Sequence, residues 1–328
     1  MPSKTYATLH TGAKMPLLGY GTWQAVEGQL EGALHAALEA GYRHIDTAAA
    51  YRNEEAIGQV LKEWMDSGKV KREDLFIVTK LPAAGIRPSG PKKWLSDSLR
   101  KLGLDYVDLY LAHCPFCAKE SPDDSPFPIG PDGKMKFESD TDHVGMWKAM
   151  EAEVHAGRAK AIGLSNYNKR LIQKVLDNCT IKPANLQVEL HVYMQQKPLV
   201  DFCHQNGITV CAYSPIGSPG SENFVKNFGI TLPDLIKNPT IVEVAQKHKK
   251  TPGQVLLKHI VQRGIIAIPK SLSKERIQQN IALFDWELST VDMAKIDALD
   301  QGKAGRIFDM AFLGLDRSHP AYPFGEYP

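Results

Sequence analysis

The sequence contains no long apolar run and no excess of charge of one sign. Its 328 residues include 39 Lys and Arg against 37 Asp and Glu, a net charge of +2 with the signs interspersed. No stretch approaches the ~20 apolar residues of a membrane span, no basic cluster with interleaved aromatic residues indicates a nucleic-acid surface, and the first ten residues lack the apolar core of a signal peptide. We therefore expect a cytoplasmic protein that binds a small molecule rather than a membrane or nucleic acid.

Cysteine is also scarce. Five cysteines, an odd number in a long chain, are typical of a reducing compartment rather than of a disulfide scaffold. We expect three of them, Cys179, Cys203 and Cys211, to be small buried hydrophobic residues. Cys114 and Cys117 have the C-x-x-C spacing of a redox or zinc pair, but no second ligand pair and no helix-opening context accompany them. We therefore predict no metal or redox site.

What the sequence does contain is an alternation of strands and helices. With 43% hydrophobic residues, the chain can bury a large core. Apolar side chains recur at helical spacing before Gly41, Asn53 is suited to cap a second helix, and Pro91 to open a third. Between the helices lie short apolar runs typical of strands buried on both faces. These predicted strands begin at Leu17, Arg43, Leu75, Tyr106, Ala159, Asn185, Ile208 and Gly264.

Eight strands that alternate with helices predict an α/β fold, a (β/α)₈ TIM barrel formed by residues 1–328 as one domain. A doubly wound open sheet is the alternative. Turn residues Thr11 and Gly12 predict an N-terminal hairpin that closes the bottom of the barrel. Three segments exceed ordinary connections and are interpreted as functional loops on the C-terminal face. They run from Cys114 to about His143, from Ile216 to about Lys237, and from Gln301 to the end.

Four polar residues occupy equivalent places in this pattern. Asp46 ends the second strand, Lys80 the third and His113 the fourth, while Tyr51 follows the second strand. Neighbouring strands lie ~4.8 Å apart, so such residues can converge in one pocket, and barrel active sites lie at that face. Each of these residues alone has an ordinary structural explanation. The prediction of an active site therefore depends on their common position at the C-terminal ends of neighbouring strands.

This set of residues suits carbonyl reduction. A free tyrosine titrates near ~10, and a neighbouring ammonium such as that of Lys80 is expected to lower this pKa, with Asp46 holding the lysine in place. The tuned phenol of Tyr51 can then protonate a developing alkoxide, with His113 orienting or sharing the proton. No protein side chain supplies hydride, so the reaction requires a bound cofactor.

The sequence offers two places for such a cofactor. At Gly19, "GYGTWQ" has the first two glycines of a dinucleotide fingerprint, but Gln24 replaces the third. In "IPKSLSKERIQQN", Lys270, Ser271 and Arg276 surround the start of a predicted helix, where cations and helix N–H groups together favour an anion. A solvated basic turn is the alternative explanation of the second stretch.

Six stretches in order along the chain resemble the signatures of the aldo-keto reductase superfamily, and within it those of insect members. They are "HIDTAAAYRNEEAIG", "IVTKL", "DLYLAHCP", "GLSNYN", "AYSPIGS" and "IPKSLSKERIQQN". The resemblance implies a barrel that binds extended NADPH without a Rossmann domain. It also implies a catalytic tetrad of Asp46, Tyr51, Lys80 and His113, with Tyr51 as the proton donor.

The resemblance further implies the cofactor contacts. For the carboxamide they are Ser165, Asn166 and Gln187, with Tyr213 stacked on the nicotinamide, and Thr22 and Trp23 complete this part of the site. For the pyrophosphate they are Ser214, Ile216 and Ser218. For the 2′-phosphate, which favours NADPH over NADH, they are Lys270, Ser271, Arg276, Gln279 and Asn280.

The substrate pocket is expected to be wide. Many members carry Trp directly after the catalytic histidine, whereas this chain has Cys114. Trp23, Phe116 and Phe308 are expected to line the pocket together with Tyr51 and His113. An apolar rim suits aliphatic aldehydes, aromatic carbonyls or a steroid ketone.

Two other functions and the oligomeric state remain to be tested. Lys80 at a strand end could form the Schiff base of an aldolase-like lyase, although Asp46 opposes the uncharged amine that this chemistry needs. The chain could instead be a non-catalytic NADPH-binding subunit. No apolar stripe is left over once the helices are assigned, so the residues themselves do not indicate an oligomeric state. The resemblance implies a monomer, as relatives of this kind often are.

Overall fold

The computed structural model describes residues 5–25, 28–121, 123–130 and 133–325. All eight predicted strands are present, and each is parallel to its neighbours. In order of position in the sheet they are β3 (Tyr20–Gly21), β4 (His44–Asp46), β5 (Phe76–Leu81), β6 (Leu109–Ala112), β7 (Ile162–Ser165), β8 (Asn185–Glu189), β9 (Thr209–Tyr213) and β10 (Ile266–Ala267). Strand order therefore follows chain order, as a barrel requires.

The sheet closes on itself between its first and last strands. A parallel bridge joins Leu18 to Ala267. The amide of Gly19 donates to the carbonyl of Ala267 at 2.9 Å, and the amide of Ala267 donates to the carbonyl of Leu17 at 2.9 Å. The (β/α)₈ barrel is confirmed, and the open doubly wound sheet was the wrong alternative.

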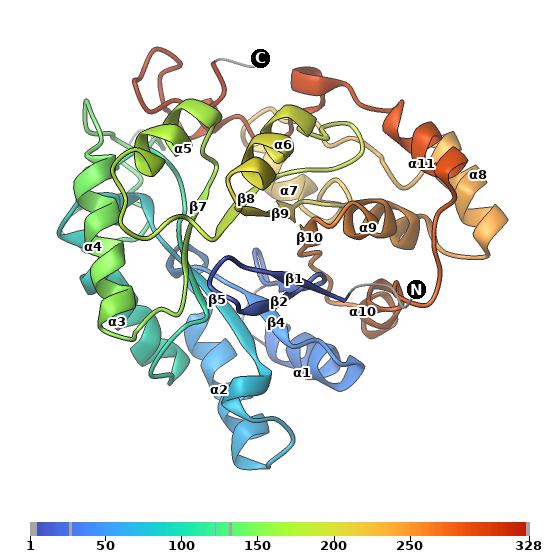
Figure 1. The fold of residues 1–328 in the computed structure, drawn as a ribbon, viewed down its shortest axis with the longest axis horizontal. Coiled ribbons are helices and arrows are strands. Elements are labelled where there is room, and N and C mark those ends of the chain that lie inside the picture. The colour runs from blue at the N-terminus through green and yellow to red at the C-terminus, as the bar shows by residue number, and fades with distance from the viewer. Residues whose placement is uncertain (1–4, 26–27, 122, 131–132, 326–328) are drawn as a thin grey trace.

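Helices surround the strands (Figure 1). The first six, from α1 to α6, follow strands in turn, and α9 and α10 complete the ring, while α8 packs outside on α9 and contacts α11. The α-helices are α1 (Leu30–Ala40), α2 (Glu54–Asp66), α3 (Gly90–Leu102), α4 (His143–His155), α5 (Lys169–Leu176), α6 (Lys197–Gln205), α7 (Glu222–Lys226), α8 (Pro239–His248), α9 (Pro252–Gln262), α10 (Lys274–Ile281) and α11 (Thr290–Asp297). The 3₁₀ turns are η1 (Ala49–Tyr51), η2 (Arg72–Asp74), η3 (Ala83–Gly85), η4 (Gly302–Gly305) and η5 (Met310–Leu313).

The predicted N-terminal hairpin is present. Its strands β1 (Tyr6–Thr8) and β2 (Lys14–Pro16) pair antiparallel, and the hairpin crosses the barrel opening in Figure 1. The side chain of Met15 is fully buried. Nδ1 of His44, at the start of β4, lies 3.3 Å from the carbonyl of Pro16. The hairpin therefore covers the N-terminal end of the barrel and leaves the opposite end for ligands.

Local signals placed most helix ends correctly, with one difference. Gly41 ends α1 in the left-handed conformation at φ 102, and Pro91 lies in the first turn of α3. Asn53 directly precedes α2, but its side chain makes no capping hydrogen bond. Its amide instead donates to the carbonyls of Thr22 (2.9 Å) and Ala25 (3.3 Å) and accepts from the Thr47 hydroxyl (2.9 Å). Asn53 thereby ties two loops at the C-terminal end of the barrel together.

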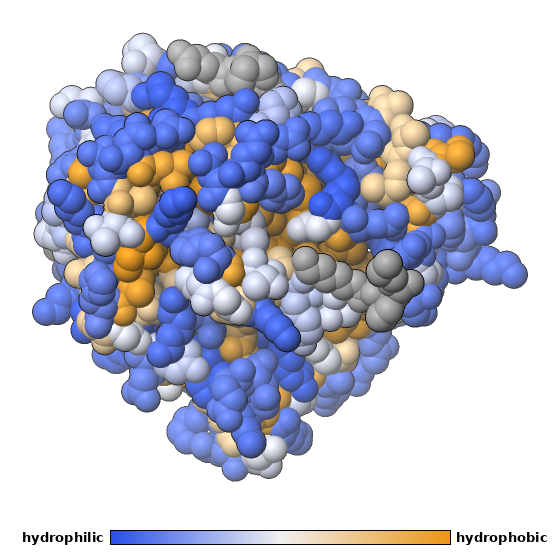
Figure 2. Space-filling view, viewed as in Figure 1, coloured by the Kyte–Doolittle hydropathy of each residue, from blue (hydrophilic) through white to orange (hydrophobic). Residues whose placement is uncertain are grey.

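The surface of the protein is mainly polar, as expected from a sequence without long apolar runs. Hydrophilic residues dominate the face with the hairpin, and apolar ones show in smaller patches among them (Figure 2). In the described parts of the chain, no helix combines the length and the apolar character that a membrane crossing requires. The prediction that residues 1–328 form one domain remains a prediction, and its positions 1–4, 26–27, 122, 131–132 and 326–328 lie outside the described residues.

Buried histidines make the stability of the fold dependent on pH. Burial lowers their pKa from the usual ~6.5 to about 4 for His44 and His143 and to about 3 for His113. Below pH ~6.5 the histidines of the unfolded chain bind protons that those of the folded chain do not. The free energy of unfolding therefore decreases as the pH is lowered from about 6.5 to the pKa of the folded state. Each pH unit in this window costs up to about 1.4 kcal/mol per histidine.

Urea unfolding measured from pH 7 to pH 4.5 tests this expectation. The free energy of unfolding should fall as the pH is lowered, and His44→Phe, which keeps an aromatic ring but cannot titrate, should make the fall shallower. An identical slope in the variant would show that His44 does not take up its proton in this pH range.

Candidate active site

A cavity of about 680 Å³ opens at the C-terminal end of the barrel. Strand ends supply its floor, and all three predicted long loops contribute to its sides. The long loops contribute lining residues between positions 114 and 135, 214 and 221, and 308 and 313, the last in the tail that starts at Gln301, and shorter loops after the strands contribute others. We call it the active-site cavity.

Asp46, Lys80 and Tyr51 form a hydrogen-bonded chain at the floor of the cavity. The Lys80 ammonium donates to Oδ1 of Asp46 at 2.5 Å, to the carbonyl of Thr47 at 2.9 Å and to the hydroxyl of Tyr51 at 3.2 Å. Oδ2 of Asp46 accepts from the side-chain amide of Gln187 at 2.7 Å. Lys80 is completely buried, and each of its three donors has a partner. The structure thus brings these predicted residues together.

Adjacent parallel strands explain this arrangement. In the β4–β5 register Asp46 lies opposite Val78, so Lys80 is two residues further towards the C-terminal end and on the same face. Because side chains alternate along a strand, Lys80 points into the barrel interior, where its long side chain can reach Asp46 and the following loop. That loop forms η1, which ends at Tyr51 and presents its hydroxyl to Lys80.

The ionisation of this group differs in one respect from the sequence-based expectation. Burial alone would lower the pKa of Lys80, but Asp46 and Tyr51 together outweigh it and keep this pKa above its usual value, so the amine is charged. The pKa of Tyr51 was expected to be lowered, but it is raised, because loss of solvent outweighs the opposing effect of Lys80. At neutral pH Tyr51 therefore holds its proton, which is the state that a proton donor requires.

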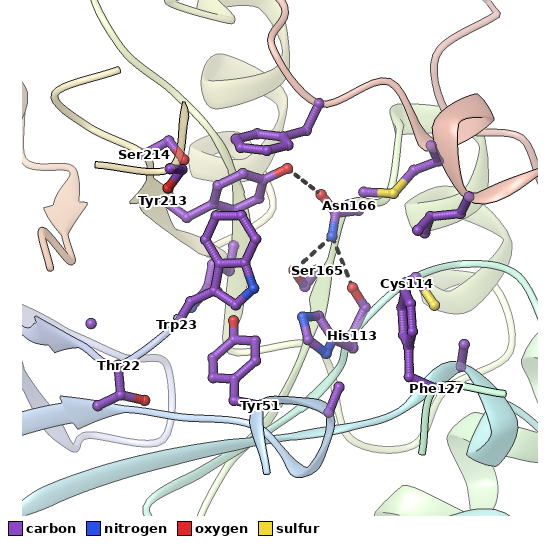
Figure 3. A pocket seen from close by; sticks show the side chains of 18 of the residues that line it. Thr22, Trp23, Tyr51, His113, Cys114, Phe127, Ser165, Asn166, Tyr213 and Ser214 are labelled. Carbon is purple, nitrogen blue, oxygen red and sulfur yellow. Dashed lines mark hydrogen bonds between the residues drawn. The ribbon is translucent and has the colours of Figure 1, made fainter. Parts of the chain in front are cut away.

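His113 faces Tyr51 across the cavity. Their rings meet edge to face, with centroids 5.6 Å apart and an angle of 76° between the planes, and Figure 3 shows both pointing into the same space. Burial and the charge of Lys80 lower the pKa of His113 to about 3. A neutral imidazole can donate one hydrogen bond and accept another, which suits it to orient an oxygen atom beside the Tyr51 hydroxyl.

The predicted carboxamide residues lie on the next strands around the barrel. The Asn166 amide donates to the carbonyl of His113 (2.9 Å) and to the hydroxyl of Ser165 (3.2 Å), and its oxygen accepts from the hydroxyl of Tyr213 (2.8 Å) (Figure 3). Asn166 has a positive φ of 64, a strained conformation typical of functional sites. Ser165, Asn166, Gln187 and Tyr213 all line the cavity.

The predicted pyrophosphate loop begins directly after β9. Ser214 and Ser218 have positive φ values of 51 and 55, and the Ser218 hydroxyl donates to that of Ser214 at 2.6 Å. Ile216 lies between them, and all three line the cavity. Thr22, which also lines the cavity, donates its hydroxyl to the carbonyl of Asp46 at 2.9 Å.

The predicted 2′-phosphate residues lie before and along α10: Lys270 and Ser271 precede the helix, and Arg276, Gln279 and Asn280 are on it. Lys270 lines the active-site cavity, and Nε of Arg276 lies 3.5 Å from the hydroxyl of Ser271. Burial and the charge of Arg276 lower the pKa of Lys270. Within the described ranges neither cation forms an ion pair with a carboxylate. Ser271, Arg276, Gln279 and Asn280 lie beyond the residues that line the cavity itself.

This arrangement fits a phosphorylated dinucleotide. Two neighbouring cations without a carboxylate partner among the described residues provide charge that a phosphate would neutralise. The backbone leaves little room beside them, because a Cβ on Gly21 would lie 2.7 Å from the carbonyl of Ile268. Lys270, which precedes α10, lines the same cavity as Tyr51, so the cavity extends from its floor to the turn before this helix.

Aromatic residues form one side of the cavity above Tyr51. Trp23 meets Phe308 edge to face at 5.5 Å, and Phe308 lies 6.3 Å from Tyr213 and 6.4 Å from Phe312, measured between ring centroids. We call these four residues the aromatic wall. Cys114 and Phe116 lie on the other side, nearly buried. The structure thus places all predicted pocket residues on the cavity.

Further apolar lining residues were missed by the sequence analysis. Their only signal was an apolar side chain within a Gly- and Pro-rich loop, which does not distinguish a pocket position from packing within the loop. They are Phe127, Ile129 and Met135 of the first loop and Met310, Phe312 and Leu313 of the tail.

The C-x-x-C pair belongs to the cavity wall and the core behind it. Cys114 and Cys117 are both buried and free, and burial raises the pKa of each thiol, so the reactive thiolate form is disfavoured. Among the described residues no group of three or more potential ligands could hold a metal ion.

Comparisons with known proteins agree with this geometry. The model of the aldo/keto reductase family matches residues 17–301. Aldo-keto reductase family 1 member A1 of Mus musculus is 43% identical over 323 residues, which is 97% of both chains, and that of Homo sapiens is 41% identical over 323 residues, again 97% of both. The solved structure of the aldose reductase from Schistosoma japonicum superposes with a TM-score of 0.87 at 38% identity, covering 98% of this chain and 99% of that one. The similarity extends over nearly the full length of each of these proteins.

Proposed function

Because the chain belongs to the aldo/keto reductase family, we propose that it is an NADPH-dependent oxidoreductase that reduces aldehydes and ketones to alcohols. One observation carries most of the weight: a charged, fully buried lysine joins Asp46 to the hydroxyl of a protonated tyrosine at the cavity floor. This is a proton donor with a stabilising cation placed behind it. The fold supports the proposal because barrel active sites lie at this end.

In the proposed site, the bound nicotinamide supplies the hydride, and the residues of the chain supply the proton and hold the reactants. Tyr51 donates its proton to the carbonyl oxygen, and Lys80 stabilises the phenolate as it forms. Asp46 and Gln187 keep Lys80 in position, since Asp46 accepts from both. His113 donates a hydrogen bond from its ring N–H to the same oxygen.

Cofactor binding is proposed to follow the cavity from floor to rim. Ser165, Asn166 and Gln187 bind the carboxamide, and Tyr213 stacks on the ring. The loop from Ser214 to Ser218 crosses the pyrophosphate. Lys270, Ser271, Arg276, Gln279 and Asn280 contact the adenosine end, where the two cations favour a 2′-phosphate.

The charge of Lys80 disfavours the lyase. A Schiff base requires an uncharged amine, whereas Asp46 and Tyr51 together hold the pKa of Lys80 above its usual value. Borohydride trapping of a carbonyl compound on Lys80 would revive that alternative. A non-catalytic binding subunit remains consistent with the fold, but it gives no reason to keep a buried lysine beside the Tyr51 hydroxyl.

We propose bulky apolar carbonyl compounds as preferred substrates. The aromatic wall and the loop residues Phe127 and Ile129 offer apolar surface above Tyr51, and Cys114 occupies less space than the tryptophan found there in many members. Aliphatic aldehydes, aromatic carbonyls and steroid ketones, including 3-dehydroecdysone, are the classes to test. We also propose that the protein works as a cytoplasmic monomer.

The function is tested by the loss of NADPH absorbance over a panel of small aldehydes, aromatic carbonyls, quinones and steroid ketones. Turnover of several panel members is expected, with the lowest KM for a large apolar carbonyl. Tight NADPH binding without any turnover would instead support the binding-subunit alternative.

Arg276→Met tests the cofactor assignment. Charge-assisted hydrogen bonds contribute about 1.5–3 kcal/mol, so the Kd for NADPH should rise about 10- to 100-fold, while the Kd for NADH should hardly change. Fluorescence titration with both nucleotides measures this. Lys274→Met is the matched control, because Lys274 is on the same helix but lies 3.5 Å from Glu39. Equal weakening of NADPH and NADH binding by Arg276→Met would refute the assignment.

A further inference from the structure

A buried carboxylate fixes the C-terminal tail to the barrel. Glu189, the last residue of β8, has no solvent exposure. Its Oε1 accepts from the backbone N–H of Ile307 at 2.7 Å, and its Oε2 accepts from the backbone N–H of Phe308 at 2.8 Å. Nε2 of His191, which is also fully buried, lies 3.0 Å from Oε1. Both carboxylate oxygens therefore bind consecutive amides of the tail.

The residues of the tail that precede Ile307 are also held against the barrel. The amide of Gln301 donates to the carbonyl of Tyr193 at 2.9 Å. Gly305 packs so closely on the same carbonyl that an added Cβ would lie 2.0 Å from its oxygen. These contacts fix the backbone from Gln301 to Gly305, and Glu189 fixes the next residues, Ile307 and Phe308, where the tail reaches the active-site cavity.

The second amide held by Glu189 belongs to the central residue of the aromatic wall. Phe308 contacts both Trp23 and Tyr213 and lines the active-site cavity. Tyr213 is opposite Glu189 in the β8–β9 register. The carboxylate thus connects the strand pair that carries Tyr213 to the segment that carries Phe308.

We propose that Glu189 is a positioning residue that fixes Phe308 in the wall of the active-site cavity and thereby sets how strongly the enzyme prefers large apolar carbonyl substrates. This inference rests on the proposed carbonyl reductase function. Glu189 makes no hydrogen bond to Asp46, Lys80 or Tyr51. Its effect should therefore appear in the binding of substrates that reach Phe308, and not in proton transfer.

A carboxylate is required by this geometry because both oxygens must accept. Glutamine has the same shape but only one acceptor, so it would turn its NH₂ group towards one of the two amides. A buried donor would then lose its partner, which is costly. Glu189→Gln should therefore release the tail locally without removing volume from the core.

Glu151 provides a matched control. It is also a buried glutamate that holds two consecutive amides, but its Oε1 alone accepts from both, from Thr180 at 2.6 Å and from Ile181 at 2.7 Å. It lies on α4, and neither it nor its two partners lines the active-site cavity. Because glutamine has one acceptor oxygen, Glu151→Gln can keep both hydrogen bonds. It therefore reports the general effect of replacing a buried glutamate by glutamine without releasing the amides that it holds.

Hydrogen exchange tests the clamp without any need for activity. In Glu189→Gln the amides of residues 302–313 should exchange at least about tenfold faster than in the wild type, because two charge-assisted hydrogen bonds are disturbed. Glu151→Gln should leave this segment unchanged. Unchanged exchange in Glu189→Gln would overturn the proposal, whatever the enzyme's activity.

Steady-state kinetics tests the consequence for selectivity. For a large apolar carbonyl, Glu189→Gln should raise KM about tenfold with kcat within about threefold, while both constants for a small aldehyde stay near wild type. Phe308→Ala should show the same preference shift, and the double variant should show no more than the larger single effect, since both act through one ring. Additive effects, equal losses for small and large substrates, or the same shift in Glu151→Gln would overturn the proposal. A wild-type protein that reduces no carbonyl would refute the proposed function instead, while the exchange result still stands.

Discussion

Replacing Tyr51 with phenylalanine should lower kcat by about 10²- to 10⁴-fold, the usual contribution of general acid catalysis, and should leave the affinity for NADPH within about twofold of wild type. The change removes one oxygen atom and leaves the ring that packs against His113. The alkoxide that develops at the carbonyl would then have no proton donor. The pKa of His113 is about 3, so at neutral pH its ring is uncharged and does not carry the additional proton that it could transfer.

Single-turnover measurements at saturating NADPH, with cofactor affinity measured separately by fluorescence, separate the two effects. Tyr42→Phe is a suitable control, because it also removes a buried hydroxyl, one that binds the carbonyl of Ile277 at 3.2 Å outside the active-site cavity. Turnover of the Tyr51 variant within about fivefold of wild type would remove Tyr51 from the proton-donor role, since acid catalysis contributes far more.

Replacing Lys80 with methionine should damage both stability and turnover. The buried Asp46 would lose its cation, and breaking one partner of a buried ion pair typically costs about 3–5 kcal/mol. The Tyr51 hydroxyl would at the same time lose the ammonium at 3.2 Å that stabilises a developing phenolate, so kcat should fall by at least about 10²-fold. Urea unfolding and NADPH consumption on the same preparations measure both losses.

A second substitution separates the two roles of Lys80. In the double variant Lys80→Met and Asp46→Asn, the uncompensated charge is gone, so much of the lost stability should return. Turnover should stay low, because no cation remains beside Tyr51. Recovery of turnover along with stability would mean that Lys80 serves the fold alone, and the proposed stabilisation of the phenolate would be wrong.

The barrel and the floor of the site could be predicted from sequence because local patterns determine them. Most predicted strands are short apolar runs followed by a polar residue. In the structure Asp46 ends β4, Lys80 is the penultimate residue of β5, and His113 directly follows β6. In a parallel sheet, residues that end neighbouring strands lie at the same edge. Tyr51 could be added because only four residues separate it from the end of β4.

The pKa of Tyr51 and the aromatic wall could not be derived in the same way. The direction of the pKa shift depends on how far the surrounding loops exclude water from Tyr51, and those loops carry no periodic pattern that predicts their path. Glu189 sits inside a predicted strand, but its partners Ile307 and Phe308 lie 118 and 119 residues away in sequence. Contacts at that separation depend on the folded path of the tail.

The hydrogen bonds of Asn53 have a consequence for how such an enzyme can evolve. They join the loop that carries Trp23 to the loop that carries Tyr51, so the proton donor rests on a network of buried polar contacts within the barrel. Phe127, Ile129, Met310 and Phe312 line the cavity from segments that supply none of the hydrogen bonds of Asn53. Mutations at these four positions can therefore accumulate and change which carbonyl compounds are accepted, while the inherited proton-transfer chemistry stays intact.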